Sequence, residues 1–432
     1  MFGCLICSNL ADAANMKGKK TQTKQKAADD GRKKKKTKNA HTKIVARPKT
    51  ISARKPKAKA TKGCTTTLSA VDARRGAHRA RVGRGAPVKY ASDCSGIDAA
   101  VVALEKLKCA VDHQWASDCF PPCRAILEHN FSIGHVLNDV MQTPTNMSQP
   151  DLYTSGFPCQ PYSTAGLRAG CHDSRSTPLW GVVQRIEKSL PKSFILENVA
   201  AFVSPSYAKV YDWLVASLCG ITDKNRRAYD LHVKVLDSQH HGSPQHRPRV
   251  FFVGVLRSCK KFDFKWPADL LEAPSLETIL DDATPGASAL PTSATGLQGI
   301  LQAYQDIVAQ GHDPEVGPWV ANIMNSKRFG AQVRCDMLPC LTRTRGTQSG
   351  FWLFHRGRML TLNELARCQG FPADRLQLPA KGATERQLGG MYGNAINVDT
   401  ILRIITRLLP AIGIATHMRD PFGAACIPAG CL

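Results

Sequence analysis

Short apolar runs alternate with longer stretches of helical spacing through the middle of the chain. The longer stretches predict helices over 99–107, 179–190 and 207–218. The short runs predict β-strands over 89–94, 132–137, 151–155, 194–196, 231–236 and 249–255, with another strand ending at 115–118. Strands that alternate with helices indicate an α/β fold with a mostly parallel, doubly wound sheet covered on both faces. In such sheets ligands bind beyond the carboxyl ends of the strands.

The alternation of strands and helices stops after residue 256. Pro, Gly and Ser become frequent from about Ser258, 287–295 resembles an insertion, and 337–344 lies in an irregular region that ends near Gly350. Helical spacing resumes over 392–409. We therefore expect a large domain over 88–256, a second, smaller domain over 257–384, a segment over 385–414 that rejoins the first domain, and a tail over 415–432.

The N-terminal segment 1–87 is strongly basic, whereas the body of the chain is nearly neutral. Residues 1–88 contain 24 Lys and Arg against 4 Asp and Glu, so they carry +20 of the chain's +24. Because this segment has little to bury, we expect it to be disordered on its own. Three interpretations stay open: a tail read by import machinery, an arm that contacts nucleic-acid phosphates, and a solvated tail without a specific partner.

Cysteine and hydropathy patterns disfavour several protein classes. The sixteen cysteines of this 432-residue chain have irregular spacing, unlike the disulfide framework of a small secreted domain. Cys4-x-x-Cys7 and Cys119-x-x-x-Cys123 each lack a matching second pair, so we expect no metal site. No apolar run approaches the roughly 18–20 residues of a membrane span, and the apolar start has no basic region before it. We expect a reduced, intracellular, soluble protein.

A glycine turn follows the first predicted strand. The segment Cys94-Ser95-Gly96-Ile97-Asp98 leads from the strand into a helix, and backbone N–H groups of such a turn can meet a polar ligand. Asp118 follows the second strand, 23 residues after Ser95. That is near the ~20-residue spacing at which an acid reaches a ribose hydroxyl in nucleotide-binding folds. One glycine is a weak signal, and an ordinary strand-to-helix turn is the alternative.

The sequence Gly-Phe-Pro-Cys-Gln-Pro-Tyr-Ser at 156–163 follows the strand at 151–155. Its prolines impose an irregular backbone. A thiol in a rigid loop at the tip of a strand suits a nucleophile, which makes Cys159 the candidate. The alternative is a buried cysteine that acts as a small hydrophobic residue. This loop resembles the catalytic loop of DNA (cytosine-5) methyltransferases.

The rest of the chain carries the other motifs of that family in the family's order. They are a glycine turn, acids after strands two and three, Glu-Asn-Val, Gln-x-Arg-x-Arg, a variable recognition region, Arg-x-Leu-Thr through Gln-Gly-Phe-Pro, and Gly-Asn. The matching positions are Gly96, Asp118, Asp139, Pro158-Cys159-Gln160, Glu197-Asn198-Val199, Gln245, Arg247, Arg249, Arg358 through Pro372, and Gly393-Asn394. The resemblance covers 88 to about 410. It implies a class-I S-adenosylmethionine-dependent methyltransferase fold with a smaller target-recognition domain.

Methylation of cytosine at C5 makes specific demands, because this ring carbon is a poor nucleophile. A thiolate must add at C6, an acid must hydrogen-bond N3, and a cation can support the exocyclic oxygen. The base must also leave the DNA stack. We assign catalysis to Cys159, Glu197 and Arg247, with Arg249 on the same face two positions later. A surface or helix-capping Glu197 and a basic strand edge are the alternatives.

The resemblance also implies ligand-binding residues. For S-adenosylmethionine these are Ser95, Gly96, Asp118 at the ribose, Asp139 at the adenine amino group, Leu179 and Asn394. For double-stranded DNA they are Gln160, Ser163, Gln245, Arg249, Thr342 and Thr344, since 337–344 resembles the part of the recognition region that faces the major groove. A protein of this kind is expected to be nuclear in a eukaryotic cell, and otherwise intracellular and associated with DNA.

The segment 94–98 departs from the family pattern, at Cys94 and at Asp98. The first motif usually reads Phe-x-Gly-x-Gly, whereas this chain has Asp98 in place of the second glycine. A carboxylate beside the cofactor's own carboxylate would cost affinity unless Asp98 points away or caps the helix. A catalytically weakened DNA- or chromatin-binding homologue is therefore one alternative function. A tRNA-directed cytosine-5 methyltransferase is another, although the Cys-Phe-Thr signature typical of that branch is missing.

Overall fold

The computed structural model describes residues 86–145, 147–158, 177–282, 290–324, 332–348 and 350–423. These residues belong to one compact unit, 81–432. Cys159, Gln160 and Ser163 lie outside the described residues, as does the basic segment before residue 86, so what the sequence predicts for them stays a prediction. In the described ranges, no helix is both long and apolar enough to cross a bilayer.

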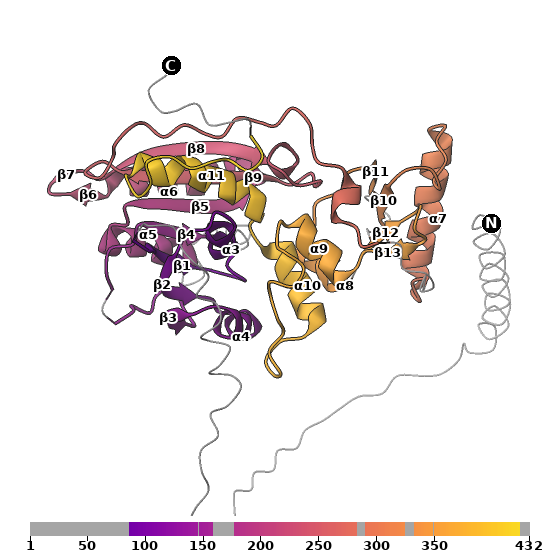
Figure 1. The fold of residues 1–432 in the computed structure, drawn as a ribbon, viewed down its shortest axis with the longest axis horizontal. Helices are drawn as coiled ribbons and strands as arrows, with labels where there is room; N and C mark the ends of the chain where they lie inside the picture. Colours follow the sequence, from indigo (N-terminus) through magenta and orange to yellow (C-terminus); the bar gives the residue numbers. More distant parts are fainter. Residues whose placement is uncertain are drawn as a thin grey trace, which may run out of the picture. The chain divides into compact units, whose positions relative to one another are not determined.

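A seven-stranded sheet forms the centre of the fold, with the strand order β3-β2-β1-β4-β5-β9-β8 (Figure 1). The first five strands are parallel, whereas β9 runs antiparallel to both β5 and β8. This arrangement confirms the predicted α/β fold with a mostly parallel sheet. The strands are β1 Val88–Asp93, β2 Val111–Ser117, β3 Ile133–Leu137, β4 Leu152–Ser155, β5 Ser193–Val199, β8 Tyr229–Asp237 and β9 Pro248–Leu256.

Side chains of the central strands alternate between two hydrophobic cores. Tyr90 and Leu152 point into one core, and their neighbours Ala91 and Tyr153 point into the other. Strands buried on both faces appear in a sequence as short continuous apolar runs, which is why they could be predicted. The first face is covered by α3 (Ala99–Lys106), α4 (Pro121–Asn130) and α11 (Val398–Ala411), and the second by α5 (Thr177–Ser189) and α6 (Ala208–Gly220).

The helical spacing over 392–409 belongs to two helices, α10 (Glu385–Asn394) and α11, rather than to one. The break falls at 395–397 because Asn397 caps α11, accepting a hydrogen bond from Thr400 N at 3.0 Å. Helix α11 is buried along nearly its whole length and packs on α3. This part of the chain therefore completes the first face of the main sheet.

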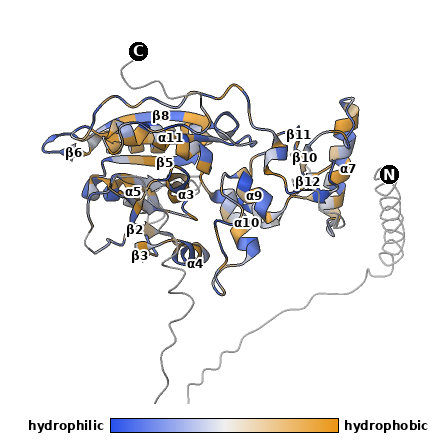
Figure 2. Cartoon of the chain, in the orientation of Figure 1, coloured by the Kyte–Doolittle hydropathy of each residue, from blue (hydrophilic) through white to orange (hydrophobic). Residues whose placement is uncertain are grey.

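A second sheet has the strand order β11-β10-β12-β13. Helix α7 (Ala294–Ala309) packs on one of its faces through Ile300, Ala303 and Ile307, and Figure 2 shows the apolar stretch along this helix. The other face contributes Val320 and Phe351 to the core of the main sheet. The strands are β10 Trp319–Asn322, β11 Gln332–Cys335, β12 Phe351–Leu353 and β13 Arg358–Met359. They fall within the predicted second domain, whose limits at 257 and 384 stay a prediction.

Helices α8 (Arg343–Gln348) and α9 (Leu362–Cys368) both contact α10. Glycines allow α8 to pack closely on α10, because a Cβ on Gly389 would overlap Gly346 O. A capping box between Thr361 and Glu364 starts α9. The remaining short elements are β6 Thr222–Asp223, β7 Arg226–Arg227, η4 Ala200–Val203, η5 Pro205–Tyr207, η6 Ser238–His240 and η7 Leu276–Ile279.

Candidate active site

The carboxyl ends of parallel strands bring several predicted site residues to one edge of the main sheet. Strand β1 leads into the glycine turn 94–98, β2 into Asp118 and β4 into 156–158, while Glu197 lies near the end of β5. Gly156 lies at the middle of this edge, because a Cβ added there would be 3.6 Å from Glu197 Oε2 and 3.9 Å from Cys94 O. The chain leading to Cys159 therefore starts between the glycine turn and Glu197.

Glu197 is a buried carboxylate, 7% exposed. Its Oε1 lies 3.1 Å from Arg249 Nε. In the antiparallel pair of β5 and β9, Glu197 is opposite Phe251, so Arg249 is its diagonal neighbour on the same face. Burial raises the pKa of Glu197, and the charges of Arg249 and Arg247 partly oppose that rise. Such a carboxyl group holds a proton more readily than a surface glutamate, which a donor to a ring nitrogen requires.

Arg249 and Arg247 approach the same sulfur atom. Arg249 Nη2 lies 3.7 Å from Cys340 Sγ, and Arg247 Nη1 lies 3.6 Å from it. The two guanidinium groups therefore meet, as their alternate positions in the sequence led us to expect. Their other partners differ: Arg249 Nε forms the ion pair with Glu197, whereas the terminal nitrogens of Arg247 bind backbone carbonyls.

Arg247 is 1% exposed and donates hydrogen bonds to Leu341 O, to Gly393 O at 3.2 Å and to Ala395 O at 2.7 Å. Burial, reinforced by the charge of Arg249, lowers the pKa of Arg247 to about 10, so the side chain stays charged at neutral pH. Arg247 thus holds the recognition segment, residues 337–344, and the end of α10, while Arg249 forms the ion pair with Glu197. The catalytic role predicted for Arg247 stays a prediction.

Gln245 is completely buried, and the DNA contact predicted for it stays a prediction. Its Oε1 accepts a hydrogen bond from Leu341 N at 2.9 Å, and its Nε2 donates to Cys368 Sγ at 3.3 Å. The physical reason for this burial is that 244–247 precede β9 and run beside the recognition segment, with a parallel bridge between Gln245 and Leu338. Both the oxygen and the nitrogen of the Gln245 side-chain amide therefore form hydrogen bonds inside the protein.

The recognition segment also contains a residue that sequence reasoning missed. Cys340 lies between the two guanidinium groups, although neither its residue type nor the motif pattern indicates such a place. Its position in the segment 337–344 was the only available signal. Thr342 and Thr344 are exposed at the start of α8, which leaves them accessible to DNA, and their role stays a prediction.

The glycine turn is built around Asp118. Gly96 N donates to Asp118 Oδ2 at 2.9 Å, and Phe120 N donates to Asp118 Oδ1 at 2.8 Å. Burial raises the pKa of Asp118, and these two backbone donors oppose the rise. Gly96 has a φ of +57°, and no described atom lies within 4 Å of a Cβ built on it. Open space over a glycine beside a half-buried acid fits a ribose, whose hydroxyl groups donate to carboxylates.

The other predicted cofactor residues occupy different environments. Asp139 is exposed after β3, where its Oδ1 accepts a hydrogen bond from Met141 N at 2.9 Å. Leu179 is buried in α5, in the same core as Phe157. Asn394 is exposed at the end of α10, and Ser95 Oγ lies 3.1 Å from Ser117 O. Their contacts with a cofactor stay predictions.

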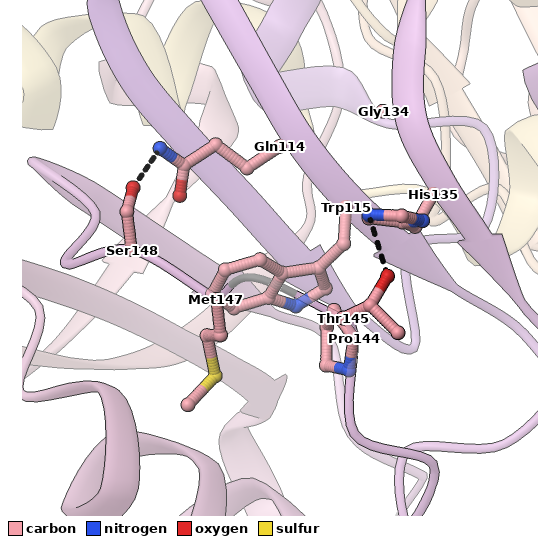
Figure 3. Close-up of a pocket in the computed structure, with 8 residues that line it drawn as sticks. All are labelled: Gln114, Trp115, Gly134, His135, Pro144, Thr145, Met147 and Ser148. Atoms are coloured by element: carbon pink, nitrogen blue, oxygen red, sulfur yellow. Dashed lines mark hydrogen bonds between the residues drawn. The ribbon is translucent and has the colours of Figure 1, made fainter.

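A pocket under the loop between β3 and β4 is separate from these residues (Figure 3). Gln114 Nε2 donates to Ser148 Oγ at 2.5 Å across it, and His135 Nε2 lies 3.4 Å from Thr145 Oγ1. The pocket opens beside the middle of β2 and β3, away from the strand ends at which the site residues gather. Its lining is Gln114, Trp115, Gly134, His135, Pro144, Thr145, Met147 and Ser148.

Comparison with known proteins identifies the family. The family model described as C-5 cytosine-specific DNA methylase matches residues 88–409, which is most of the chain. The chain belongs to this family. Both the glycine turn and the Glu197–Arg249 pair lie inside the matched range. Members of this family depend on S-adenosylmethionine, and the open glycine turn beside Asp118 fits that cofactor.

Curated relatives of this DNA methylase include type II methyltransferases of bacteria. Type II methyltransferase M.NlaX of Neisseria lactamica is 28% identical over 285 residues, which cover 66% of this chain and 84% of the relative. Type II methyltransferase M.NgoBI of Neisseria gonorrhoeae is 26% identical over 324 residues, which cover 73% of this chain and 92% of the relative. The matches span most of each relative's length, so they extend beyond a single shared motif.

Solved structures agree with the fold. A Spodoptera frugiperda DNMT2 mutant has a TM-score of 0.53 at 16% identity, covering 74% of this chain and 99% of that one. The Entamoeba histolytica methyltransferase EhMeth has a TM-score of 0.50 at 16% identity, covering 75% of this chain and 98% of that one. At such low identity these neighbours support the class-I methyltransferase fold alone.

Proposed function

We propose that this DNA methylase transfers a methyl group to C5 of a cytosine that has left the stack of double-stranded DNA. One observation carries the proposal: the buried carboxyl group of Glu197, paired with Arg249, lies beside Gly156 at the start of the Cys159 loop. A proton donor and a cation are thus fixed next to the segment that carries the candidate nucleophile. That is the set of groups that addition to a cytosine ring requires.

The proposed reaction begins with addition of the Cys159 thiolate to C6. A sulfur–carbon bond forms while the C5–C6 double bond opens. Electron density then reaches N3, and Glu197 donates its proton to that nitrogen. C5 then forms a bond to the methyl group while the bond from that group to the cofactor's sulfur breaks, and N3 returns its proton to Glu197. Loss of the C5 proton to solvent lets the sulfur of Cys159 leave C6 and restores the C5–C6 double bond, so the thiolate is regenerated.

In this scheme the other residues of the site bind the cofactor and orient the reacting groups. When bound, S-adenosylmethionine supplies an electrophilic methyl group. Asp118 would hold its ribose and Asp139 its adenine amino group, with Gly96 leaving room for it. Arg249 keeps the carboxyl group of Glu197 directed at the base, since its ion pair fixes Oε1. Arg247 and Gln245 hold the backbone of the recognition segment against the catalytic sheet.

The basic N-terminal segment suggests a second contact with the substrate. We propose that 1–87 binds DNA phosphates or the import machinery, and that the protein is nuclear in a eukaryotic cell. The support is its charge, since these residues contribute most of the net +24 of the chain.

The test is methyl transfer from labelled S-adenosylmethionine to duplex DNA and, in parallel, to tRNA. We expect label at C5 of cytosine in DNA, and its loss in the Glu197→Ala variant. Label in tRNA alone would favour the tRNA-directed branch of the superfamily. Absence of label in both, with DNA binding intact, would favour the non-catalytic homologue.

A further inference from the structure

Asp98 is a buried carboxylate at the point where the glycine turn enters α3. It is 3% exposed, and its φ of +53° lies in the left-handed region, which most residues other than glycine avoid. Aspartate tolerates this region better than most side chains, but glycine adopts it without a buried charge. The contacts of this carboxylate therefore have to offset both desolvation and backbone strain.

Those contacts connect Asp98 to three strands of the main sheet. Asp98 Oδ1 accepts a hydrogen bond from Tyr90 OH at 2.5 Å, and Asp98 Oδ2 lies 3.4 Å from His113 Nε2. Tyr90 in β1 is paired with His113 in β2, and its hydroxyl also lies 2.6 Å from Thr154 Oγ1 in β4. The carboxylate points into the protein, so it does not face the space over Gly96 in which like charges would meet.

A chain of hydrogen bonds leads from Asp98 back to the turn. Asp98 Oδ2 accepts from Ser92 Oγ at 2.8 Å, and Ser92 Oγ lies 2.7 Å from Ser95 Oγ. Ser95 Oγ in turn accepts from Ser117 N at 3.1 Å, directly before Asp118. Asp98 is thus linked through two hydroxyl groups to the strand end that presents the acid predicted to hold the ribose.

We propose that Asp98 is a positioning residue for S-adenosylmethionine: through Ser92 and Ser95 it fixes the turn 94–98 in the conformation that receives the cofactor. The inference rests on the proposed function, because the ligand at this turn is the cofactor of that reaction. It reverses the expectation that an acid at this position weakens binding. The buried carboxylate of Asp98 stabilises the turn through hydrogen bonds inside the protein.

The experiment measures the dissociation constant of S-adenosylhomocysteine by isothermal titration, since this product binds at the same site without turnover. Asp98→Gly is the principal variant, because glycine accepts a φ of +53° and backbone strain cannot explain its effect. We expect at least tenfold weaker binding in Asp98→Gly and a smaller loss in Asp98→Asn, which keeps the shape and one acceptor oxygen. The KM for DNA should stay within twofold of the wild type.

Asp151 provides a matched control at the opposite ends of the strands. It is 4% exposed, and its Oδ2 accepts a hydrogen bond from Lys89 N at 2.9 Å. Asp151→Asn should lower the melting temperature and leave the dissociation constant within twofold of the wild type. If the variants of Asp98 and Asp151 weaken binding in proportion to their loss of melting temperature, Asp98 is merely structural and the proposal is wrong.

Ser92→Ala keeps the test decisive if Asp98→Gly does not fold. This variant removes the link to Ser95 and leaves Asp98 bound to Tyr90. Ser92→Ala should weaken the binding of S-adenosylhomocysteine at least tenfold. An unchanged dissociation constant in Ser92→Ala or in Asp98→Gly would overturn the proposal. Failure of the wild type to bind S-adenosylhomocysteine would instead contradict the proposed function, so the two failures are distinguishable.

Discussion

Arg249 Nε lies 3.1 Å from Glu197 Oε1, and both side chains are largely withdrawn from solvent. The pair combines two opposite effects on the carboxyl group. Burial favours its neutral form, whereas the guanidinium charge favours its ionised form, and the balance leaves the pKa of Glu197 raised. Arg249 thus limits how far the pKa rises while it fixes the orientation of the carboxyl group.

Activity should fall as the pH rises through this elevated pKa. The protonated form of Glu197 is the donor to N3, and a group with a raised pKa keeps its proton to a higher pH and loses it above that value. We expect kcat/KM to show a basic limb that disappears in Glu197→Gln, with roughly 10²–10⁴-fold lower activity. In Arg249→Gln the pKa of Glu197 should rise further, because the guanidinium charge that opposes the rise is gone. Any residual activity should therefore persist to higher pH. A limb that shifts to lower pH in Arg249→Gln would contradict this account.

Replacement of Arg247 by methionine should destabilise the protein rather than only slow the reaction. The change leaves the carbonyls of Leu341, Gly393 and Ala395 without their donor. Each unsatisfied buried acceptor costs ~1–3 kcal/mol, so we expect a loss of about 3 kcal/mol or more in the free energy of unfolding.

Urea unfolding measures this loss, and Arg257→Met is the control. Arg257 forms an ion pair with Asp230, but 54% of its side chain is exposed. Surface pairs of this kind contribute ~0–1 kcal/mol. Similar losses in the Arg247 and Arg257 variants would show that Arg247 is not needed to hold the recognition segment.

Gly389→Ala should separate α8 from α10. The new methyl group would overlap Gly346 O, a backbone atom that cannot move without its helix. Overpacking of this kind costs ~1–3 kcal/mol, and because α8 carries Thr344 we also expect weaker DNA binding. Gly220→Ala is the control, since nothing lies within 4 Å of its added Cβ. Thermal unfolding and DNA affinity of both variants are the measurements, and equal behaviour would contradict the close packing.

Deletion of residues 1–86 should flatten the dependence of DNA affinity on salt. If the basic arm neutralises phosphates, log K falls with log salt by roughly 0.9 per phosphate contact, and the deletion removes the arm's share. The slope is measured by fluorescence anisotropy of a labelled duplex between low and moderate salt. An unchanged slope rules the arm out as a DNA contact and favours the import interpretation or a solvated tail.

Most of the main sheet could be predicted because each buried strand is a short apolar run with polar residues at its end. The break between α10 and α11 could not be predicted as easily, because apolar spacing continues across it. Asn397 does provide a capping signal, but the hydrophobic period outweighs one polar residue. The sequence therefore predicted a helical region correctly and missed its division.

The site was predictable where strand geometry controls it. Glu197 and Arg249 belong to paired strands, and their meeting follows from the register. Gln245 and Arg247 precede β9, so their side chains are placed by the recognition segment instead. That contact joins residues about ninety positions apart, and no local pattern encodes it. The direction of the Asp98 side chain depended likewise on partners in β1 and β2.

The central claim is tested most directly with duplex DNA in which the target cytosine is replaced by 5-fluorocytosine. Fluorine at C5 cannot leave as a proton does, so the sulfur stays on C6 after methyl transfer. With S-adenosylmethionine present, we predict a covalent protein–DNA complex that survives denaturing electrophoresis and is absent in Cys159→Ser. A covalent complex that persists in Cys159→Ser, or no complex from a wild-type protein that binds both DNA and cofactor, would contradict the account.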